Sequence, residues 1–293
     1  MNLHNTKLIT GLWRLASWEL RQQSLLRFIH QNLELGIDTF DHADIYGSYT
    51  CESIFGEALS LEPGLRPKLK LITKCGIKLP YQRFEGIRLN FYDTSKPHII
   101  DSVHHSLANF KTDYLDLLLI HRPDPLLDAD EVADAFQTLK QQGKVLNFGV
   151  SNFTPFQFQL LQSRLDFQLV TNQVEFSLLH MQPAHDGTLD QCQQLRIAPL
   201  AWSPLAGGRL LTDFSEQAQR LRSVMQQLRD ELNGAEADQI ALAWIMRHPA
   251  HIVPILGTGN IDRIKSACQA IDLKLTREQW FMLWAASNGH NVP

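Results

Sequence analysis

The sequence predicts an α/β fold, a closed (β/α)8 barrel with a core of eight parallel strands, each followed by a helix. Three observations support this prediction. Short apolar segments alternate with amphipathic segments along all 293 residues. Several apolar segments are hydrophobic at consecutive positions, as parallel strands covered on both faces should be. No stretch rich in proline, glycine and serine divides the chain, so we expect a single domain over residues 1–293.

Strands and helices can be assigned in order along the chain. The predicted strands span residues 9–15, 36–42, 68–76, 114–122, 145–152, 169–176, 197–205 and 251–259. The predicted helices span residues 17–36, 51–60, 96–113, 128–145, 154–166, 189–196, 238–249 and 261–270. Gly36 ends the first helical pattern, and Pro155 stands at a helix start.

Two long links interrupt the alternation, at residues 77–96 and 206–235, and residues 216–233 of the second are helical in pattern. Both links follow strands, on the side of a barrel where active sites form. Long links in compact domains usually either serve a function or are disordered.

Composition excludes several classes of partner. The net charge of −4 does not favour binding to nucleic acid or to an anionic lipid surface. No apolar stretch approaches the roughly 20 residues that a membrane helix needs. The N-terminus has no secretory pattern, and the four cysteines do not have the spacing of a zinc site. We expect a cytoplasmic protein that acts on a small molecule, without a metal.

The segment FDHADIYGSY, residues 40–49, ends the second predicted strand with polar side chains. Asp41 closes the strand and Tyr46 lies in the turn beyond it. Lys74 ends the third predicted strand, and His121 ends the fourth. The carboxyl ends of barrel strands meet at one rim, so these four residues should converge there.

The four residues suit proton transfer to a carbonyl oxygen. The pKa of a tyrosine is about 10, and a nearby ammonium group such as that of Lys74 should lower it. Asp41 would hold Lys74 charged, and His121 could orient the carbonyl. These side chains provide no nucleophile for the carbonyl carbon, so a hydride from a nicotinamide is the expected complement. Each residue alone has a structural explanation, as a turn, cap or core residue, but four together at neighbouring strand ends indicate a site.

The motifs DHADIYG, ITKCG and LLLIHRPDP resemble those of the aldo-keto reductases in order and in spacing. The resemblance continues through GKVLNFGVSNF, TNQVEFSLL, AWSPLAGG and PILGTGNIDRI, and covers nearly the whole chain. It implies NADPH-dependent reduction of an aldehyde or ketone, with Tyr46 as proton donor, Asp41 and Lys74 beside it, and His121 orienting the carbonyl. It also implies a monomer.

The resemblance further implies a cofactor site. Ser151, Asn152 and Gln173 would hold the nicotinamide carboxamide, and Phe176 would stack on the ring. The residues expected to contact the cofactor are Gly11, Leu12, Trp13, Asp41, Ser151, Asn152, Gln173, Phe176, Trp202, Ser203, Pro204, Leu205, Gly207, Arg209, Gly257, Thr258, Gly259, Asn260 and Arg263. Of these, residues 202–210 would follow the pyrophosphate.

One position departs from the family pattern. Many relatives have a basic residue, which clamps the adenosine 2′-phosphate, where this chain has Gly259. Arg263 matches another basic position of the motif. NADP is therefore expected over NAD, by a small margin.

Two other functional classes stay open at this point. One is a non-catalytic NADP-binding module like the β subunits of voltage-gated channels. The other is a metal-dependent hydrolase that uses His42, Asp44 and His121. Aromatic residues of the first long link, Tyr81, Phe84, Phe91 and Tyr92, would either bind apolar carbonyl compounds or pin the link to the barrel.

Overall fold

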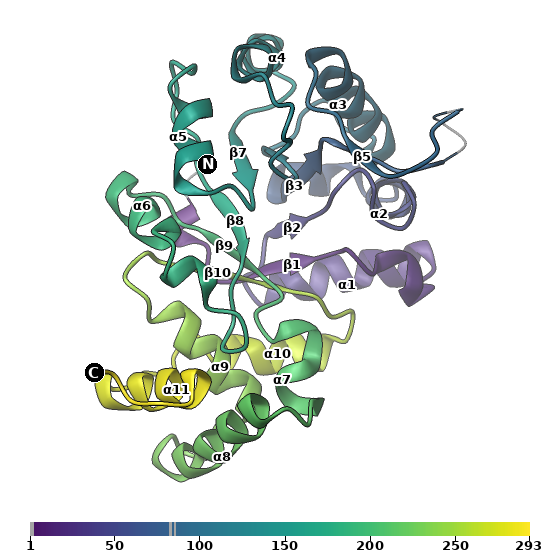
Figure 1. Cartoon of the computed structure of the whole chain (residues 1–293). Helices are drawn as coiled ribbons and strands as arrows, with labels where there is room; N and C mark the ends of the chain where they lie inside the picture. The colour runs from purple at the N-terminus through teal and green to yellow at the C-terminus, as the bar shows by residue number, and fades with distance from the viewer. Residues whose placement is uncertain (1–2, 82–83, 85) are drawn as a thin grey trace.

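The structure, a computed structural model, describes residues 3–81, 84 and 86–293 and confirms the predicted barrel (Figure 1). Around the barrel the strands are β1 (Ile9–Gly11), β2 (Thr39–Asp41), β3 (Lys70–Cys75), β6 (Leu117–Ile120), β7 (Phe148–Ser151), β8 (Asn172–Glu175), β9 (Leu200–Trp202) and β10 (Val253–Leu256). All pairs are parallel, and β10 pairs with β1 to close the barrel. Each strand lies within the segment predicted for it.

Helices surround the barrel in the predicted places (Figure 1). They are α1 (Gln22–Glu34), α2 (Cys51–Leu59), α3 (Lys96–Phe110), α4 (Ala129–Gln141), α5 (Pro155–Gln162), α6 (Thr188–Leu195), α8 (Glu216–Glu231), α9 (Ala237–Met246) and α10 (Ile261–Gln269). The first begins later than predicted, because a 3-10 turn, η2 (Leu15–Trp18), and a left-handed Glu19 at φ 50° precede it.

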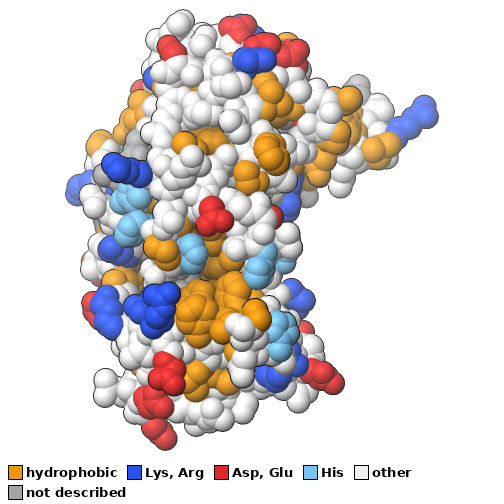
Figure 2. All heavy atoms as spheres, turned by 60° about the vertical axis from the view of Figure 1, so that its left-hand side comes forward, with side chains coloured by type: hydrophobic (Ala, Val, Ile, Leu, Met, Phe, Trp, Pro, Cys, Tyr) orange, Lys and Arg blue, Asp and Glu red, His pale blue; other side chains and the backbone are white. Residues whose placement is uncertain are grey.

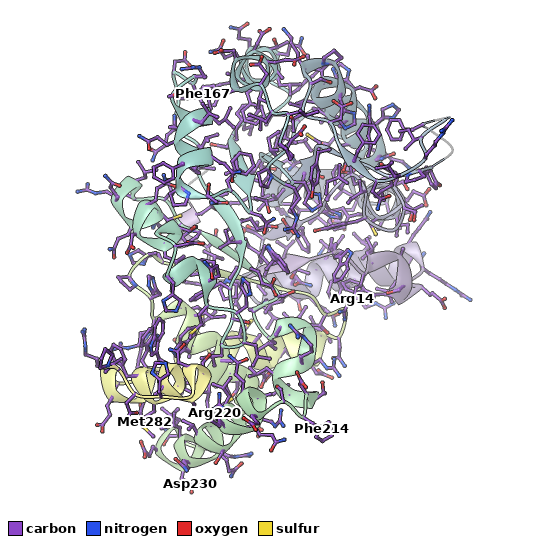
Figure 3. The ribbon with its side chains drawn as sticks, viewed as in Figure 1. Arg14, Phe167, Phe214, Arg220, Asp230 and Met282 are labelled. Atoms are coloured by element: carbon purple, nitrogen blue, oxygen red, sulfur yellow. The ribbon has the colours of Figure 1, made fainter. Side chains whose placement is uncertain are left out.

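Several elements were not predicted. They are α7 (Arg209–Thr212), α11 (Arg277–Asn288), a hairpin of β4 (Ile77–Lys78) with β5 (Phe91–Tyr92), and the 3-10 turns η1 (Leu3–Asn5), η3 (Pro63–Lys68), η4 (Gln182–Ala184) and η5 (Ala206–Gly208). The hairpin lies in the first long link, of which residues 82–83 and 85 are outside the described residues. In the second link, Phe214 points away from the barrel (Figure 3), whereas Leu221 and Leu228 of α8 are buried in one cluster with Leu283 of α11.

The barrel interior is apolar below its mouth. Ile72, Leu119 and Leu200 belong to a small cluster inside the strands, separate from the larger clusters between strands and helices. Side chains two residues apart on a strand share a face. Lys74 lies two residues after Ile72, and His121 lies two residues after Leu119. Their side chains therefore also face the barrel interior, at the rim where the strands have their carboxyl ends. This alternation places the polar strand ends together.

The outer surface is mixed in character. Figure 2 shows hydrophobic and histidine side chains across the middle of one face, with acidic side chains toward its upper and lower ends. Among the helices formed by described residues, none combines the length and the apolar character that crossing a bilayer requires.

Candidate active site

The buried ammonium group of Lys74 is the centre of the site. Lys74 is 1% exposed, and its Nζ donates to Asp41 Oδ2 at 2.8 Å. It also donates to the backbone oxygen of His42 at 2.6 Å and to Tyr46 Oη at 3.2 Å. An ammonium group has three donors, and here each one has an acceptor. The charge is thus held in one orientation, with Tyr46 as its outermost contact.

Asp41 is fixed from two sides. Its Oδ2 receives Lys74, and its Oδ1 accepts a hydrogen bond of 2.8 Å from Gln173 Nε2, on the other side of the barrel. Burial alone would lower the pKa of Lys74, but Asp41 and Tyr46 outweigh it and hold that pKa above its ordinary value. Lys74 therefore stays charged at neutral pH.

The pKa of Tyr46 does not shift as the sequence predicted. Burial raises it, Lys74 lowers it, and Asp41 raises it again, so the pKa is above its ordinary value. The predicted net lowering is wrong, because Asp41 offsets the charge of Lys74 and burial disfavours the phenolate. Tyr46 consequently keeps its proton across the neutral range.

His121 follows β6 and faces Tyr46. Their ring centroids are 5.9 Å apart, in an edge-on arrangement. Burial, followed by Lys74 and Arg122, holds the pKa of His121 well below its ordinary value, so the imidazole is neutral. Its Nδ1 is buried and has no hydrogen-bond partner within the described part of the chain. The ring can therefore give one hydrogen bond, and it is not an acid at neutral pH.

Amide groups link this cluster to the next three strands. Ser151 Oγ donates to the backbone oxygen of Gln173 at 2.9 Å. Asn152, in a left-handed conformation at φ 61°, donates to the backbone oxygen of His121 at 3.3 Å. Trp202 Nε1 in turn donates to Asn152 Oδ1 at 2.9 Å. Predicted catalytic residues and predicted carboxamide-binding residues thus form one hydrogen-bonded network around the mouth.

The Aldo/keto reductase family model matches residues 7–287. The chain belongs to the aldo-keto reductase family. It is 52% identical to oxidoreductase YdhF of Escherichia coli, over 98% of this chain and 95% of that protein. It is 44% identical to the 6-dehydroglucose reductase of Agrobacterium fabrum, over 99% of this chain and 97% of that protein.

A solved structure agrees with this assignment. The aldo/keto reductase from Klebsiella pneumoniae, in complex with NADP and acetate, superposes with a TM-score of 0.77 at 25% identity, covering 97% of this chain and 92% of that one. By family and by fold, this aldo-keto reductase is an oxidoreductase.

In this aldo-keto reductase, Phe176 does not lie where the sequence analysis placed it. Its side chain is fully buried among the helices, with its ring stacked on Trp244 at 5.4 Å between centroids. Gln173 points into the barrel, so a residue three positions later points outward, because strand side chains alternate. A nicotinamide cannot stack there. Trp202, which is partly exposed and hydrogen-bonded to Asn152, presents an aromatic ring at the mouth instead.

Strand β1 contributes little side-chain surface to the mouth. Gly11 is buried, and a Cβ there would come within 2.7 Å of Ile255 Cγ2, so this glycine serves the close approach of β1 to β10. The side chain of Leu12 belongs to the core, whereas Trp13 is 60% exposed. Only Trp13 of these three predicted contacts offers a side chain to a ligand.

The loop after β9 exposes its backbone at two glycines and has an unusual backbone conformation. Ser203, Ala206, Gly207 and Gly208 all have positive φ values between 50° and 97°. Nothing lies within 4 Å of a Cβ added at Gly207 or Gly208, so the backbone there borders open space. Within the rest of the predicted set, Pro204 is buried, Leu205 is partly buried, and Arg209 is exposed.

The loop after β10 caps its own helix. The Asn260 side chain accepts from the backbone N–H groups of Asp262 at 2.8 Å and Arg263 at 3.4 Å, and Thr258 Oγ1 accepts from the Asn260 N–H. Gly257 is exposed with open space beside it. A Cβ at Gly259 would lie 2.6 Å from the ring of Trp18, so the indole occupies the place of a side chain at that position. Arg263 is exposed at the surface of α10.

The structure bears on two questions that the sequence left open: whether His42 belongs to a metal site, and what the aromatic residues of the first long link do. His42 packs between Phe55 and Phe110, with ring centroids 4.8 and 4.9 Å away, and burial followed by Lys74 holds its pKa well below the ordinary value. It faces the helices and does not join His121, as a shared metal site would require. In the first long link, Tyr81 and Phe84 pack on Tyr49, at 5.3 and 5.8 Å between centroids, so these two aromatics pin the link to the barrel.

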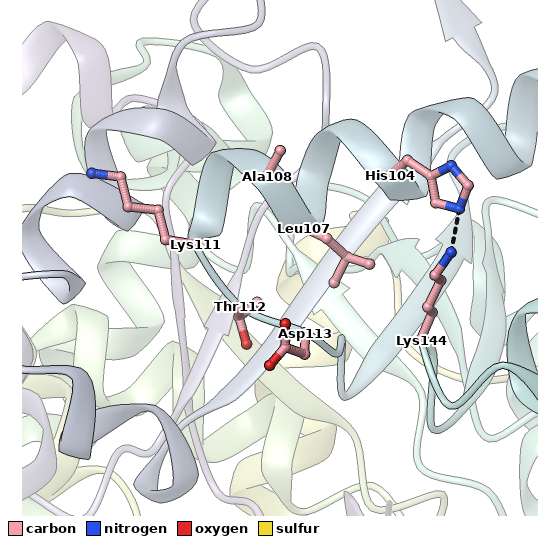
Figure 4. A pocket seen from close by; sticks show the side chains of 7 residues that line it. All are labelled: His104, Leu107, Ala108, Lys111, Thr112, Asp113 and Lys144. Atoms are coloured by element: carbon pink, nitrogen blue, oxygen red, sulfur yellow. Dashed lines mark hydrogen bonds between the residues drawn. The ribbon is translucent and has the colours of Figure 1, made fainter.

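A hollow elsewhere carries none of the predicted site residues. It lies where α3 ends and β6 and β7 begin, at the rim opposite the mouth (Figure 4). Lys144 Nζ donates to His104 Nε2 there at 2.7 Å.

Two residues at the mouth, Arg122 and Trp18, were not predicted from the sequence. Arg122 directly follows His121 at a strand end, a signal the sequence offered, whereas the contact of Trp18 with Gly259 joins distant segments and had no local signal.

Proposed function

We propose that this enzyme reduces the carbonyl group of an aldehyde or ketone with NADPH, and that Tyr46 donates the proton. The observation that carries the proposal is the chain Asp41–Lys74–Tyr46, in which Lys74 Nζ lies 3.2 Å from Tyr46 Oη and 2.8 Å from Asp41 Oδ2. The phenol is protonated at neutral pH, as a proton donor must be.

The side chains have distinct roles in this reaction. The neutral His121 hydrogen-bonds the carbonyl oxygen and orients it beside Tyr46. As that oxygen gains negative charge, it becomes more basic than a phenolate and takes the Tyr46 proton. Lys74 stabilises the phenolate that remains, and Asp41 keeps Lys74 charged and in place. These residues therefore account for the proton transfer of the reaction, and none of them supplies the hydride.

Nicotinamide, when bound, supplies the hydride that the side chains lack. The mouth fits such a cofactor: Trp202 offers an aromatic ring, and Ser151, Asn152 and Gln173 offer amide and hydroxyl groups. The open backbone at residues 207–208 and 257 suits phosphates. Arg263 would meet the 2′-phosphate, which supports NADPH over NADH. Asp262, in the same helical turn, opposes a phosphate, so the preference is small.

Replacement of the phenol tests the proposal. Tyr46→Phe removes the hydroxyl and keeps the ring, so we expect kcat to fall by about 10²–10⁴-fold while NADPH still binds. Steady-state oxidation of NADPH with a simple aldehyde, beside fluorescence titration of NADPH, measures both quantities. Near wild-type turnover in Tyr46→Phe would overturn the proton-donor role.

The pH profile of the wild type provides a second readout of the same group. Reduction requires the protonated phenol, and the Tyr46 pKa is raised. We therefore expect kcat to stay level through neutral pH and to fall only in the alkaline range, beyond the ordinary pKa of a tyrosine. The same assay addresses the non-catalytic alternative, since a binding module of the channel β-subunit type would bind NADPH and turn over no aldehyde.

Substrate choice begins with the relatives. Because one relative at 44% identity is a 6-dehydroglucose reductase, 6-dehydroglucose belongs in a panel of aldehydes, ketones and quinones, run with NADPH and with NADH.

A further inference from the structure

Arg122 places a positive charge beside the residues proposed to act on the carbonyl. It directly follows His121 at the end of β6 and is partly buried. Its guanidinium carbon lies 5.5 Å from the centre of the Trp202 ring. The charge is close enough to lower the pKa of Tyr46 and of His121.

This charge has no anionic partner among the residues that the structure describes. Across residues 3–81, 84 and 86–293, the guanidinium of Arg122 makes no ion pair and no hydrogen bond. Asp124, two residues further along, accepts from Thr94 Oγ1 at 2.9 Å and from the backbone of Leu126 instead. A guanidinium carries five N–H donors, and none of those of Arg122 has an acceptor in the described part of the chain.

Arg66 shows how the same chain treats a structural arginine. Its guanidinium donates to the backbone oxygens of Leu69 and Tyr114, to Thr112 Oγ1 and to Asp116 Oδ2. Burying a charge without a partner is unfavourable, and the buried guanidinium of Arg66 is accordingly surrounded by hydrogen-bond acceptors. Arg122 is partly buried and has no such acceptor among the described residues.

Trp202 gives the guanidinium a fixed platform. The indole N–H is held by Asn152 Oδ1 at 2.9 Å, which sets the plane of the ring. A guanidinium over an aromatic face gains cation–π attraction while its N–H groups remain available for an acceptor. The donors are therefore oriented before a ligand arrives.

We propose that Arg122 binds a carboxylate or phosphate group carried by the substrate, so that the preferred substrates are anionic aldehydes or ketones. The inference rests on the proposed function, because it places the carbonyl at Tyr46 and His121 and the anionic group of the same molecule at Arg122.

A matched pair of substrates tests it: 4-oxobutanoate and its neutral methyl ester, with a second pair, 4-formylbenzoate and its methyl ester, to vary the reach. For the wild type with saturating NADPH, we expect kcat/KM to favour at least one anion over its ester by about tenfold or more, as a charge-assisted contact allows. The preference should lie mainly in KM and should shrink as salt rises.

Three variants assign the preference to one side chain. Arg122→Met should remove the preference, lowering kcat/KM for the anions about tenfold more than for their esters, whereas Arg122→Lys should keep part of it. Arg277→Met is the matched control, because Arg277 also lies over an aromatic ring, that of Phe281 at 5.9 Å, but on α11 at the outside of the barrel. It should keep the wild-type preference.

The outcomes separate the two proposals. Reduction of the esters without any preference for the anions, or an equal loss of both in Arg122→Met, would overturn the role of Arg122 alone. A wild type that reduces none of these aldehydes with either nicotinamide, while NADPH binds, would overturn the proposed function and this inference with it.

Discussion

The two halves of the barrel mouth are built by different means. On the half formed by β2, β3 and β6, buried side chains hold one another: Lys74 donates to Asp41 at 2.8 Å, and Gln173 of β8 donates to Asp41 from across the barrel at 2.8 Å. On the half formed by β9 and β10, the loops at residues 203–210 and 257–260 offer backbone, glycines and exposed side chains. Proton transfer needs reacting groups held at fixed positions, whereas phosphates can be met by backbone N–H groups.

The largest effect should come from breaking the first half. Lys74→Met leaves Asp41 buried without its cation, which typically costs about 3–5 kcal/mol of folding free energy. It also removes the group proposed to stabilise a Tyr46 phenolate, so we expect kcat to fall by about 10²-fold or more. Urea unfolding and steady-state kinetics measure the two losses.

A double variant separates them. Asp41→Asn combined with Lys74→Met removes both charges, and should recover most of the stability without recovering turnover. If Lys74→Met were as stable as the wild type, the buried pair would not hold this half of the mouth together.

The next effect concerns Phe176, which is buried among the helices and belongs to neither half of the mouth. Phe176→Ala removes a fully buried ring that stacks on Trp244, and such changes cost about 3–5 kcal/mol. We expect the free energy of unfolding to fall by that amount, while the KM for NADPH stays within about twofold, an allowance of a few tenths of a kcal/mol. A stable variant with a greatly raised KM for NADPH would return Phe176 to the cofactor site.

A smaller effect should appear at the second half, and only for one cofactor. Arg263→Ala should weaken NADPH binding by about tenfold or more, the value of a charge-assisted contact, and leave NADH binding unchanged. Lys265→Ala is the control, because Lys265 is exposed on the same helix and pairs with Asp262 at 3.4 Å. Equal losses for the two nucleotides in Arg263→Ala would show that this side chain does not meet the 2′-phosphate.

The smallest effect should come from Trp202, which ends β9 in the second half. Trp202→Ala should weaken nicotinamide nucleotide binding by about 0.5–1.5 kcal/mol, the value of an aromatic stack. Trp202→Phe, which keeps a ring and loses the N–H, should restore most of it. Titration of both variants with NADPH decides between stacking and the hydrogen bond to Asn152.

The sequence predicted one half better than the other for a physical reason. Asp41, Lys74 and His121 are polar where their strands end, and strand ends can be read locally. Phe176 was misplaced because a motif match does not take account of side-chain direction. Side chains alternate along a strand, so with Gln173 pointing inward, Phe176 must point outward. The net pKa shift of Tyr46 depends on burial and on three charges together, which no local pattern gives.

The fold follows the same division. All eight strands were predicted from local apolar patterns, but their closure into a barrel depends on pairing between β1 and β10, at opposite ends of the chain. Helix α11 was missed although a signal was present: Thr276 and Gln279 form a capping box at its start. The packing of Trp18 against Gly259 joins segments about as distant as β1 and β10, so only the structure reveals it.

That packing has an evolutionary consequence. Because the Trp18 ring fills the space beside Gly259, a single change from Gly259 to lysine or arginine would collide with the indole before it could gain a phosphate. We therefore expect the two positions to be coupled, so that a basic residue at position 259 is better tolerated where the residue at position 18 is smaller. Along an evolutionary path toward tighter NADP selectivity, we expect the tryptophan to be replaced first.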